Sequence, residues 1–422
     1  MDRARFCTQA LAIGACLLPL PLSANSLPVD LFLADDYSLD PEALGYHIVA
    51  PPPTAVSTFS QRLEGGREQG LTALTTRLRS RLQHPFSELM HAAITVEADL
   101  NAPVRWDRIA DDRLQFQGRV DEAAVHFEEG RWQLAAGWQE SSWGTVEGAH
   151  VLDVLSPQTL DVTEDIGGRK QPQLSIQGSV RIATLDLSAW LFPDPLATRE
   201  AQQQSAQNGT EAADPGFALQ LSSRAPRSVT TLHLARLSSD TPVQVTASEP
   251  ATRDPYWLFG LSSRVPVGPV EWRGELVYKS SLYPADAPTP SAPIPSADSS
   301  AHGRLEGATG LRIITRRFGE WEGFMTARRW FDDQALIDTE AWQNELALSW
   351  LDSWYANRIS TRLSVYGSFS DAYLTGVART GWHYDHGSEL SLTLTQYFAD
   401  DGTPFADRHR QTRYLAQWQY RF

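Results

Sequence analysis

Two histidines and an aspartate, His383, Asp385 and His386 in GWHYDHG, form the cluster whose residue types could do acid–base chemistry. A histidine beside a carboxylate can act as a general base. A polar cluster at a strand end or turn is the more ordinary interpretation. The sequence has no Gly-x-Ser-x-Gly elbow, HExxH helix, phosphate-binding glycine loop or histidines at metal-ligand spacing. We therefore expect no enzyme, no catalytic residue, no metal site and no cofactor.

Charged side chains of opposite sign gather in two other parts of the chain. Segment 144–169 carries five acids, which are Glu147, Asp153, Asp161, Glu164 and Asp165. The polar positions of later alternating stretches carry basic residues, which are Arg273, Lys279, Arg312, Arg316, Arg362, Arg413 and Arg421. If the two sets faced each other across a pore, their transverse field would select solutes by charge and dipole. In the alternative, the basic side chains pair with glutamates, namely Glu271, Glu275, Glu345 and Glu389.

The stretches that carry the basic residues are predicted to be β-strands with one apolar face. In VEWRGELVYKS (270–280), every second residue from Val270 to Tyr278 is apolar or glycine, and most of the intervening residues are charged. Side chains alternate across a strand, so this spacing separates an apolar face from a polar one. Four further stretches repeat it, namely RWQLAAGWQESS (131–142), RIATLDLSAWLF (181–192), ISTRLSVYGSF (359–369) and SELSLTLTQYF (388–398).

The C-terminal stretch QTRYLAQWQYRF alternates up to its last side chain. Tyr414, Trp418, Tyr420 and Phe422 share one face. The stretch has about the 9–11 residues that cross a bilayer as a strand, although an edge strand of a soluble sheet would look similar. A closing barrel strand cannot fray without exposing sheet edges to hydrocarbon, so we predict Phe422 at the periplasmic end of such a strand. The pattern also resembles the signal by which outer-membrane barrels are recognised for assembly.

The connections between the predicted strands alternate between short and long. Short turns fall near 128–131 and 266–269, whereas 192–215 and 281–303 are long and low in complexity and must lie in water. Outer-membrane barrels have this asymmetry. Counting predicts a transmembrane antiparallel β-barrel of about 16 strands (14–18), the first near 91–100. An even number places both termini in the periplasm, with the protein in the cell outer membrane.

The start of the chain predicts export. Two arginines precede an apolar run to about Leu22, which indicates a signal peptide over residues 1–26. Both cysteines, Cys7 and Cys16, lie within it, so the mature protein has none and forms no disulfide. No apolar run of 18 residues follows, and no spanning helix is predicted.

Residues 27–90 form the remaining segment, predicted to lie in the periplasm before a barrel that spans residues 91–422. Within it, leucines at helical spacing from Leu71 to Leu82 indicate a short helix or a plug. Three glycines at 65, 66 and 70 support the alternative of a marginal helix.

The net charge of −15 argues against nucleic acid or an anionic lipid surface as a partner. The acids in DQALIDTE (333–340) and ADDGT (399–403) could bridge cations to lipopolysaccharide, although solvated acidic loops explain them more simply. We expect outer-membrane lipid and lipopolysaccharide, the barrel assembly machinery and small hydrophilic solutes as partners. The sequence makes no prediction of oligomeric state.

Residues 118–175 carry a series of short motifs. These are VDEAAVHFEEGRWQLAAGWQESSWG (120–144), VLDVLSPQTL (151–160) and the basic residue and proline in RKQP (169–172). They resemble a porin-like family of Gram-negative outer-membrane proteins of unassigned function. Trp143-Gly144 and the Asp153…Pro157 pair agree with the family, whereas Gly137-Trp138-Gln139 stands where the family has Gly-Arg-Gln. The resemblance implies an outer-membrane barrel and leaves its solute open.

These features predict a porin-like channel for small hydrophilic solutes. A barrel of about sixteen strands would leave a wide aqueous channel, so we expect segment 144–169 to fold inward and narrow it. The alternative is a non-conducting, plugged barrel that anchors or assists an export or envelope complex.

Overall fold

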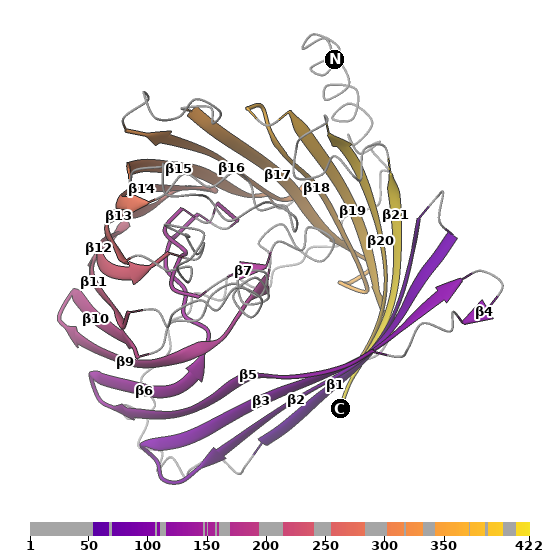
Figure 1. Cartoon of the computed structure of the whole chain (residues 1–422), viewed down its shortest axis with the longest axis horizontal. Helices are drawn as coiled ribbons and strands as arrows, with labels where there is room; N and C mark the ends of the chain where they lie inside the picture. Colours follow the sequence, from indigo (N-terminus) through magenta and orange to yellow (C-terminus); the bar gives the residue numbers. More distant parts are fainter. Residues whose placement is uncertain are drawn as a thin grey trace, which may run out of the picture.

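The protein folds as one closed antiparallel β-barrel, seen along its opening in the computed structural model (Figure 1). Strands that follow one another in the chain pair as neighbours, and the last strand, β21, pairs with the first, β1. The ring contains 18 strands. The predicted fold class, an all-β antiparallel barrel, is therefore confirmed, and the strand number exceeds the expected value of about sixteen.

The structure describes residues 54–66, 70–105, 108–109, 115–146, 148–149, 151–156, 158–159, 169–193, 214–239, 255–282, 302–315, 318–331, 342–370, 372–384, 387–399 and 411–422. The predicted signal peptide lies outside these ranges, as do the two acidic stretches except Ala399. Within them, no helix is long and apolar enough to cross a membrane.

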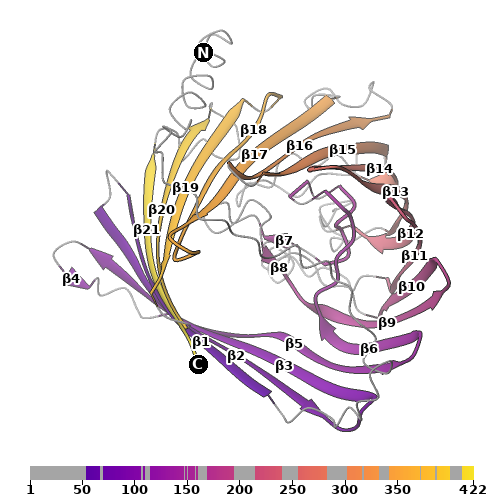
Figure 2. The ribbon, with the colours of Figure 1, turned by 180° about the vertical axis from the view of Figure 1, so that it is seen from behind.

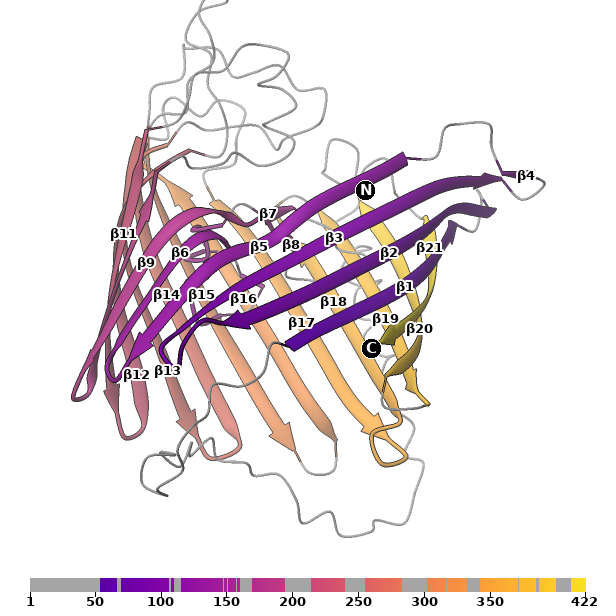
Figure 3. The same cartoon turned by 90° about the horizontal axis from the view of Figure 1, so that it is seen from below.

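The ring strands are β1 (Thr54–Gly66), β2 (Gly70–Pro85), β3 (Met90–Arg105), β5 (Gln115–Glu129), β6 (Trp132–Gln139), β9 (Gln173–Ile182), β10 (Leu185–Phe192), β11 (Gly216–Ala225), β12 (Ser228–Ser238), β13 (Pro255–Val267), β14 (Val270–Leu282), β15 (His302–Thr315), β16 (Gly319–Trp330), β17 (Trp342–Trp354), β18 (Ile359–Ser368), β19 (Tyr373–His383), β20 (Ser388–Ala399) and β21 (Thr412–Arg421). The remaining strands form two short pairings. β4 (Arg108–Ile109) pairs with the end of β3, and β7 (Gln158–Thr159) pairs with β8 (Arg169–Lys170). Figure 3 shows β1, β2, β3 and β5 steeply inclined to the strands from β14 to β18.

Each strand presents an exposed apolar face and a second face, which we call the inner face. Leu219 and Leu221 on β11 are each 40% exposed, whereas Ala218 and Ser222, which flank this pair, are buried. The period of two in the sequence therefore sorts apolar side chains outward and small or polar ones inward. A continuous apolar exterior of this kind needs an apolar environment.

The N-terminal part of the chain differs from the prediction. Residues 54–66 and 70–85 form β1 and β2 of the ring, so the expected segment 27–90 and the barrel start at 91 are wrong over these residues. Leu74, Leu78 and Leu82 are four residues apart, a spacing that places side chains on one face of a helix and equally on one face of a strand. The ring strands from β3 onward agree with the predicted count of sixteen, and β1 and β2 add the other two.

The turns agree with the sequence at two positions and differ at a third. Turns at residues 130–131 and 268–269 join β5 to β6 and β13 to β14. The stretch 181–192, expected as one strand, is interrupted by a turn at 183–184, where Ala183 adopts a positive φ of 54°. Sequence alternation continues through this turn and hides it.

Candidate functional site

The segment that follows β6 packs against the inner face of the barrel, and its ribbon runs within the ring of strands in both end views (Figures 1 and 2). Trp143, Val146, Val151, Leu152 and Leu155 are buried in one apolar cluster with residues of β10 to β17. The wall beneath them consists partly of small residues, which are Ala218, Ala235, Gly260, Ala308 and Gly310. Gly260 lies so close to the segment that a Cβ there would be 2.5 Å from Leu152 Cδ2. Small wall residues therefore make room for the segment.

A buried carboxylate on β14 binds the backbone of this segment. Glu275 is 7% exposed and accepts hydrogen bonds from the backbone N–H groups of Thr145, Val146 (2.7 Å) and Leu152 (3.3 Å). Its cross-strand neighbours, Ser262 and Ala308, are small and uncharged. The alternative stated above paired Glu275 with a basic side chain, but its described hydrogen bonds go to the segment.

The segment is also folded on itself through the motif residues. Asp153 Oδ1 accepts a hydrogen bond from the Trp143 backbone N–H (3.1 Å), and Asp153 Oδ2 lies 2.6 Å from Lys170 Nζ. Lys170 also donates to the Ser142 hydroxyl, and the Ser141 N–H donates to Ser156 Oγ (2.8 Å). Asp153 is thus engaged within the segment and its flanks.

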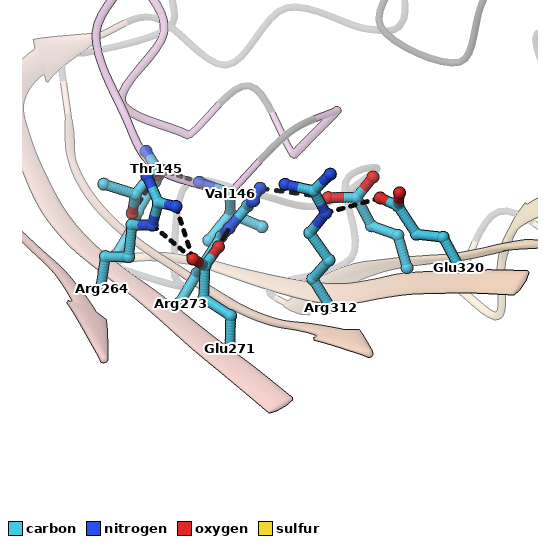
Figure 4. Close-up of polar contacts among 9 residues, drawn as sticks. Thr145, Val146, Arg264, Glu271, Arg273, Arg312 and Glu320 are labelled. Carbon is cyan, nitrogen blue, oxygen red and sulfur yellow. Dashed lines mark hydrogen bonds and ion pairs between the residues drawn. The ribbon is translucent and has the colours of Figure 1, made fainter. Parts of the chain in front are cut away.

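Most of the basic residues predicted to line a pore form ion pairs along the inner face. Figure 4 shows Arg273 and Arg312 beside carboxylates of their own or neighbouring strands, next to Thr145 and Val146. The pairs are Arg273 with Glu271 (2.6 Å) and Glu322 (3.1 Å), Lys279 with Glu306 (2.8 Å), Arg312 with Glu320 (2.5 Å), and Arg413 with Glu64. These contacts favour the alternative in which wall glutamates neutralise the basic side chains.

Of the other residues predicted to line the pore, two are exposed and five lie outside the described ranges. Arg362 on β18 and Arg421 at the end of β21 are exposed. Glu345 and Glu389, proposed as partners, pair with Arg328 (3.4 Å) and Arg379 (3.4 Å). Five residues lie outside the described ranges, which are Glu147, Asp161, Glu164, Asp165 and Arg316.

A second charge network, absent from the sequence-based set, lies on β2, β3 and β5. Arg77 pairs with Asp99 (2.8 Å), and Arg119 bridges Asp121 (2.7 Å) and the buried Glu97 (2.9 Å). Sequence reasoning missed it because the N-terminal segment was assigned outside the barrel. The alternation of Arg77, Arg79 and Arg81 with a period of two could have revealed it.

A polar cavity of about 590 Å³ lies between this network and the segment. Arg79 reaches it with a side chain 51% exposed and 3.3 Å from Asp121. Partial loss of water, and then the Asp121 carboxylate, raise the pKa of the Glu140 carboxyl. The cavity is lined by Thr58, Ser60, Arg77, Arg79, Glu97, Glu140, Ser142, Lys170, Gln417 and Gln419.

The four aromatic residues of the C-terminal stretch lie on or next to β21, which joins β20 to β1. Phe422 exchanges two backbone hydrogen bonds with Ser57, each 2.8 Å long. Trp418 packs edge-on against Phe59 of β1 at 5.9 Å, and Tyr420 stacks on Phe422 at 5.8 Å. Tyr414 is 47% exposed on the same face. Their part in assembly remains a prediction.

The histidine cluster is only partly described. His383 Nδ1 lies 3.9 Å from Glu389 Oε2 at the end of β19, whereas Asp385 and His386 lie outside the described ranges. Among the side chains that the structure describes, no group of three or more is arranged to hold a metal ion.

No family model and no curated protein matches the chain. Among solved structures, it is similar to Pseudomonas aeruginosa OpdK with vanillate (TM-score 0.52, 9% identity, covering 88% of this chain and 98% of that chain). It is also similar to P. aeruginosa OccK2 (OpdF) in complex with glucuronate (0.50, 13%, 88% and 98%) and to Acinetobacter baumannii OccAB1 (0.52, 8%, 88% and 96%). At these identities the likeness establishes the fold, that of the Occ and Opd porins.

Proposed function

We propose that this protein is a porin-like channel of the Gram-negative outer membrane that passes small hydrophilic solutes. The observation that carries the proposal is the closed ring of 18 strands, with an apolar exposed face and an inner face that carries the ion pairs and, from β10 to β17, the apolar cluster. Only a closed sheet satisfies its backbone hydrogen bonds in hydrocarbon, and a ring of this size encloses an aqueous lumen. No catalytic step forms part of the proposal.

The same exposed apolar face of the barrel supports a location in the outer membrane. The exposed apolar face would contact outer-membrane lipid, with lipopolysaccharide at the outer rim, and β21 would be recognised by the barrel assembly machinery. Both termini would then lie in the periplasm. The solved structures that share the fold are outer-membrane porins, which supports this location by analogy.

Segment 144–169 would narrow the channel. The support is its contact with one side of the wall, from β10 to β17, where segment and wall form a buried apolar cluster. Water would therefore pass on the opposite side, along β1, β2, β3 and β21, where the 590 Å³ cavity is lined by charged, hydroxyl and amide side chains. Vanillate and glucuronate, in the structures of OpdK and OccK2, are small solutes of the size and polarity that such a passage suits.

The test is single-channel conductance of the refolded mature chain in a planar bilayer, alone and with residues 144–169 deleted. We expect steady conductance from the intact chain and a larger conductance after deletion, because deletion removes the segment from the lumen. A fold control is the compact, SDS-resistant form of each variant.

Silence from the intact chain with conductance only after deletion would support the alternative of a plugged barrel that serves an export or envelope complex. Silence from both folded variants would refute the channel.

A further inference from the structure

One side chain outside the motif region attaches the segment to the wall. Glu275 lies on β14, more than a hundred residues from the segment, and receives the N–H groups of Thr145, Val146 and Leu152. Both carboxylate oxygens take part, Oε1 with the first two residues and Oε2 with the third. Hydrogen bonds to a charged group contribute more than neutral ones, and a buried carboxylate that loses them is costly to keep.

The segment is shaped to receive this carboxylate. Gly144 has a φ of 95°, in the left-handed region that side-chain-bearing residues rarely adopt. A Cβ at this position would lie 2.7 Å from Glu275 Oε1. The glycine of the Trp143-Gly144 motif is therefore required both by the backbone conformation and by the approach of Glu275.

Glu275 differs from the other glutamates of the inner wall. Glu271, Glu306 and Glu322 form ion pairs with arginine or lysine, whereas no cation among the described residues pairs with Glu275. Its neighbours on β13 and β15 are Ser262 and Ala308, which cannot neutralise it. Its charge is thus balanced by the backbone N–H groups of the segment.

We infer that Glu275 is the positioning residue that holds the segment against the wall and thereby sets the width of the channel. The inference rests on the proposed function. The motif residues fold the segment through Asp153 and Lys170, and Glu275 determines where in the barrel the folded segment lies.

The test replaces Glu275 with glutamine, which keeps the shape but turns one accepting oxygen into a donor amide facing N–H groups. We expect a Glu275→Gln conductance between those of the intact chain and the 144–169 deletion. Added to the deletion, Glu275→Gln should change conductance no further. The matched control is Glu320→Gln, since Glu320 is an inner-face carboxylate that pairs with Arg312.

A second readout does not require conduction. The mature chain has no cysteine, so an Ala149→Cys reporter at a position that is 0% exposed measures whether the segment is seated. Glu275→Gln should raise the rate at which a water-soluble maleimide labels it, and Glu320→Gln should not. Should Glu275→Gln fail to fold, Gly144→Ala disturbs the same contact and is expected to raise labelling likewise.

The outcomes separate the two proposals. Faster labelling without conductance in any variant would keep Glu275 as the positioning residue and reject the channel. A conducting protein whose conductance and labelling are unchanged by Glu275→Gln and Gly144→Ala would reject the inference and leave the channel intact.

Discussion

Single residues decide how closely the segment approaches the wall. Leu152 is fully buried, and its side chain lies over Gly260 of β13, where any larger residue would collide with it. His233, itself buried, packs against Trp143 with ring centroids 4.9 Å apart and bonds Ser262 Oγ at 3.0 Å. The segment and the wall are therefore complementary in shape, and a change on one side should be felt on the other.

The Leu152–Gly260 contact predicts coupled effects on stability. Leu152→Ala should lower the free energy of unfolding by about 2–5 kcal/mol through the cavity it leaves. Gly260→Ala should cost about 1–3 kcal/mol through overpacking. The double variant should lose about 0.5–3 kcal/mol less free energy of unfolding than the two single variants lose together, because the cavity left by Leu152→Ala accommodates the methyl group added by Gly260→Ala. Urea unfolding in lipid vesicles measures all three. Leu152→Ala with Val267→Ala, an exposed residue at the end of β13, is the additive control.

At the scale of elements, the seam between β1 and β21 closes the barrel. The two strands pair antiparallel from Thr58↔Arg421 to Gly66↔Arg413. On its other edge, β1 pairs regularly with β2 from Thr54 to Glu64, and the register shifts only between Glu64 and Gly65. A strand edge exposed to hydrocarbon would leave backbone groups unpaired, so the ring depends on this seam.

The seam can be tested by cross-linking in a chain that lacks residues 1–26, the predicted signal peptide that contains both cysteines. Ser57 and Phe422 form a hydrogen-bonded pair, so the Ser60↔Gln419 pair three residues along is of the narrow kind, with Cα atoms about 4.5 Å apart. Ser60→Cys with Gln419→Cys should form a disulfide on oxidation, detected by mass spectrometry. Ser60→Cys with Gln417→Cys, a diagonal pair about 7–8 Å apart, should not. Equal cross-linking of both pairs would contradict the register.

At the scale of the whole molecule, the two sides of the barrel interior differ. The side from β10 to β17 holds the segment in an apolar cluster, and the side of β1, β2, β3 and β21 borders the polar cavity. Wall charges are largely neutralised in pairs, so ion preference should depend on charges that remain accessible near the cavity. Arg79, with its half-exposed side chain, and Glu140 are the candidates.

Neutralising these two charges should shift ion selectivity in opposite directions. A unit charge about 8 Å from a permeating ion in water is worth about 0.5 kcal/mol, which is about twofold in local ion concentration. In a salt gradient, the reversal potential of Glu140→Gln should therefore shift in the direction of greater anion selectivity. That of Arg79→Gln should shift in the direction of greater cation selectivity. Arg181→Gln, at the end of β9 and outside the lining of this cavity, is the control. Equal shifts from all three variants would contradict a passage along β1, β2 and β3.

Local sequence patterns were enough to assign the class of fold. Alternation with a period of two is a local property that every strand displays, so 270–280, 388–398 and the terminal aromatic residues could be assigned without knowing their neighbours. Assignment from the sequence failed where one pattern fits both a helix and a strand, as with Leu74, Leu78 and Leu82. It also failed where the alternation continues through a turn, as at Ala183.

The tertiary structure decided which charges meet. Glu275 and Thr145 are brought together only when the ring closes and the segment packs on β14, and the contact of Leu152 with Gly260 depends on the same packing. The polar cavity likewise draws residues from both ends of the chain, since β1 and β21 become neighbours only at the seam. Local patterns fix the face on which a side chain lies, whereas its partner depends on the register and closure of the entire sheet.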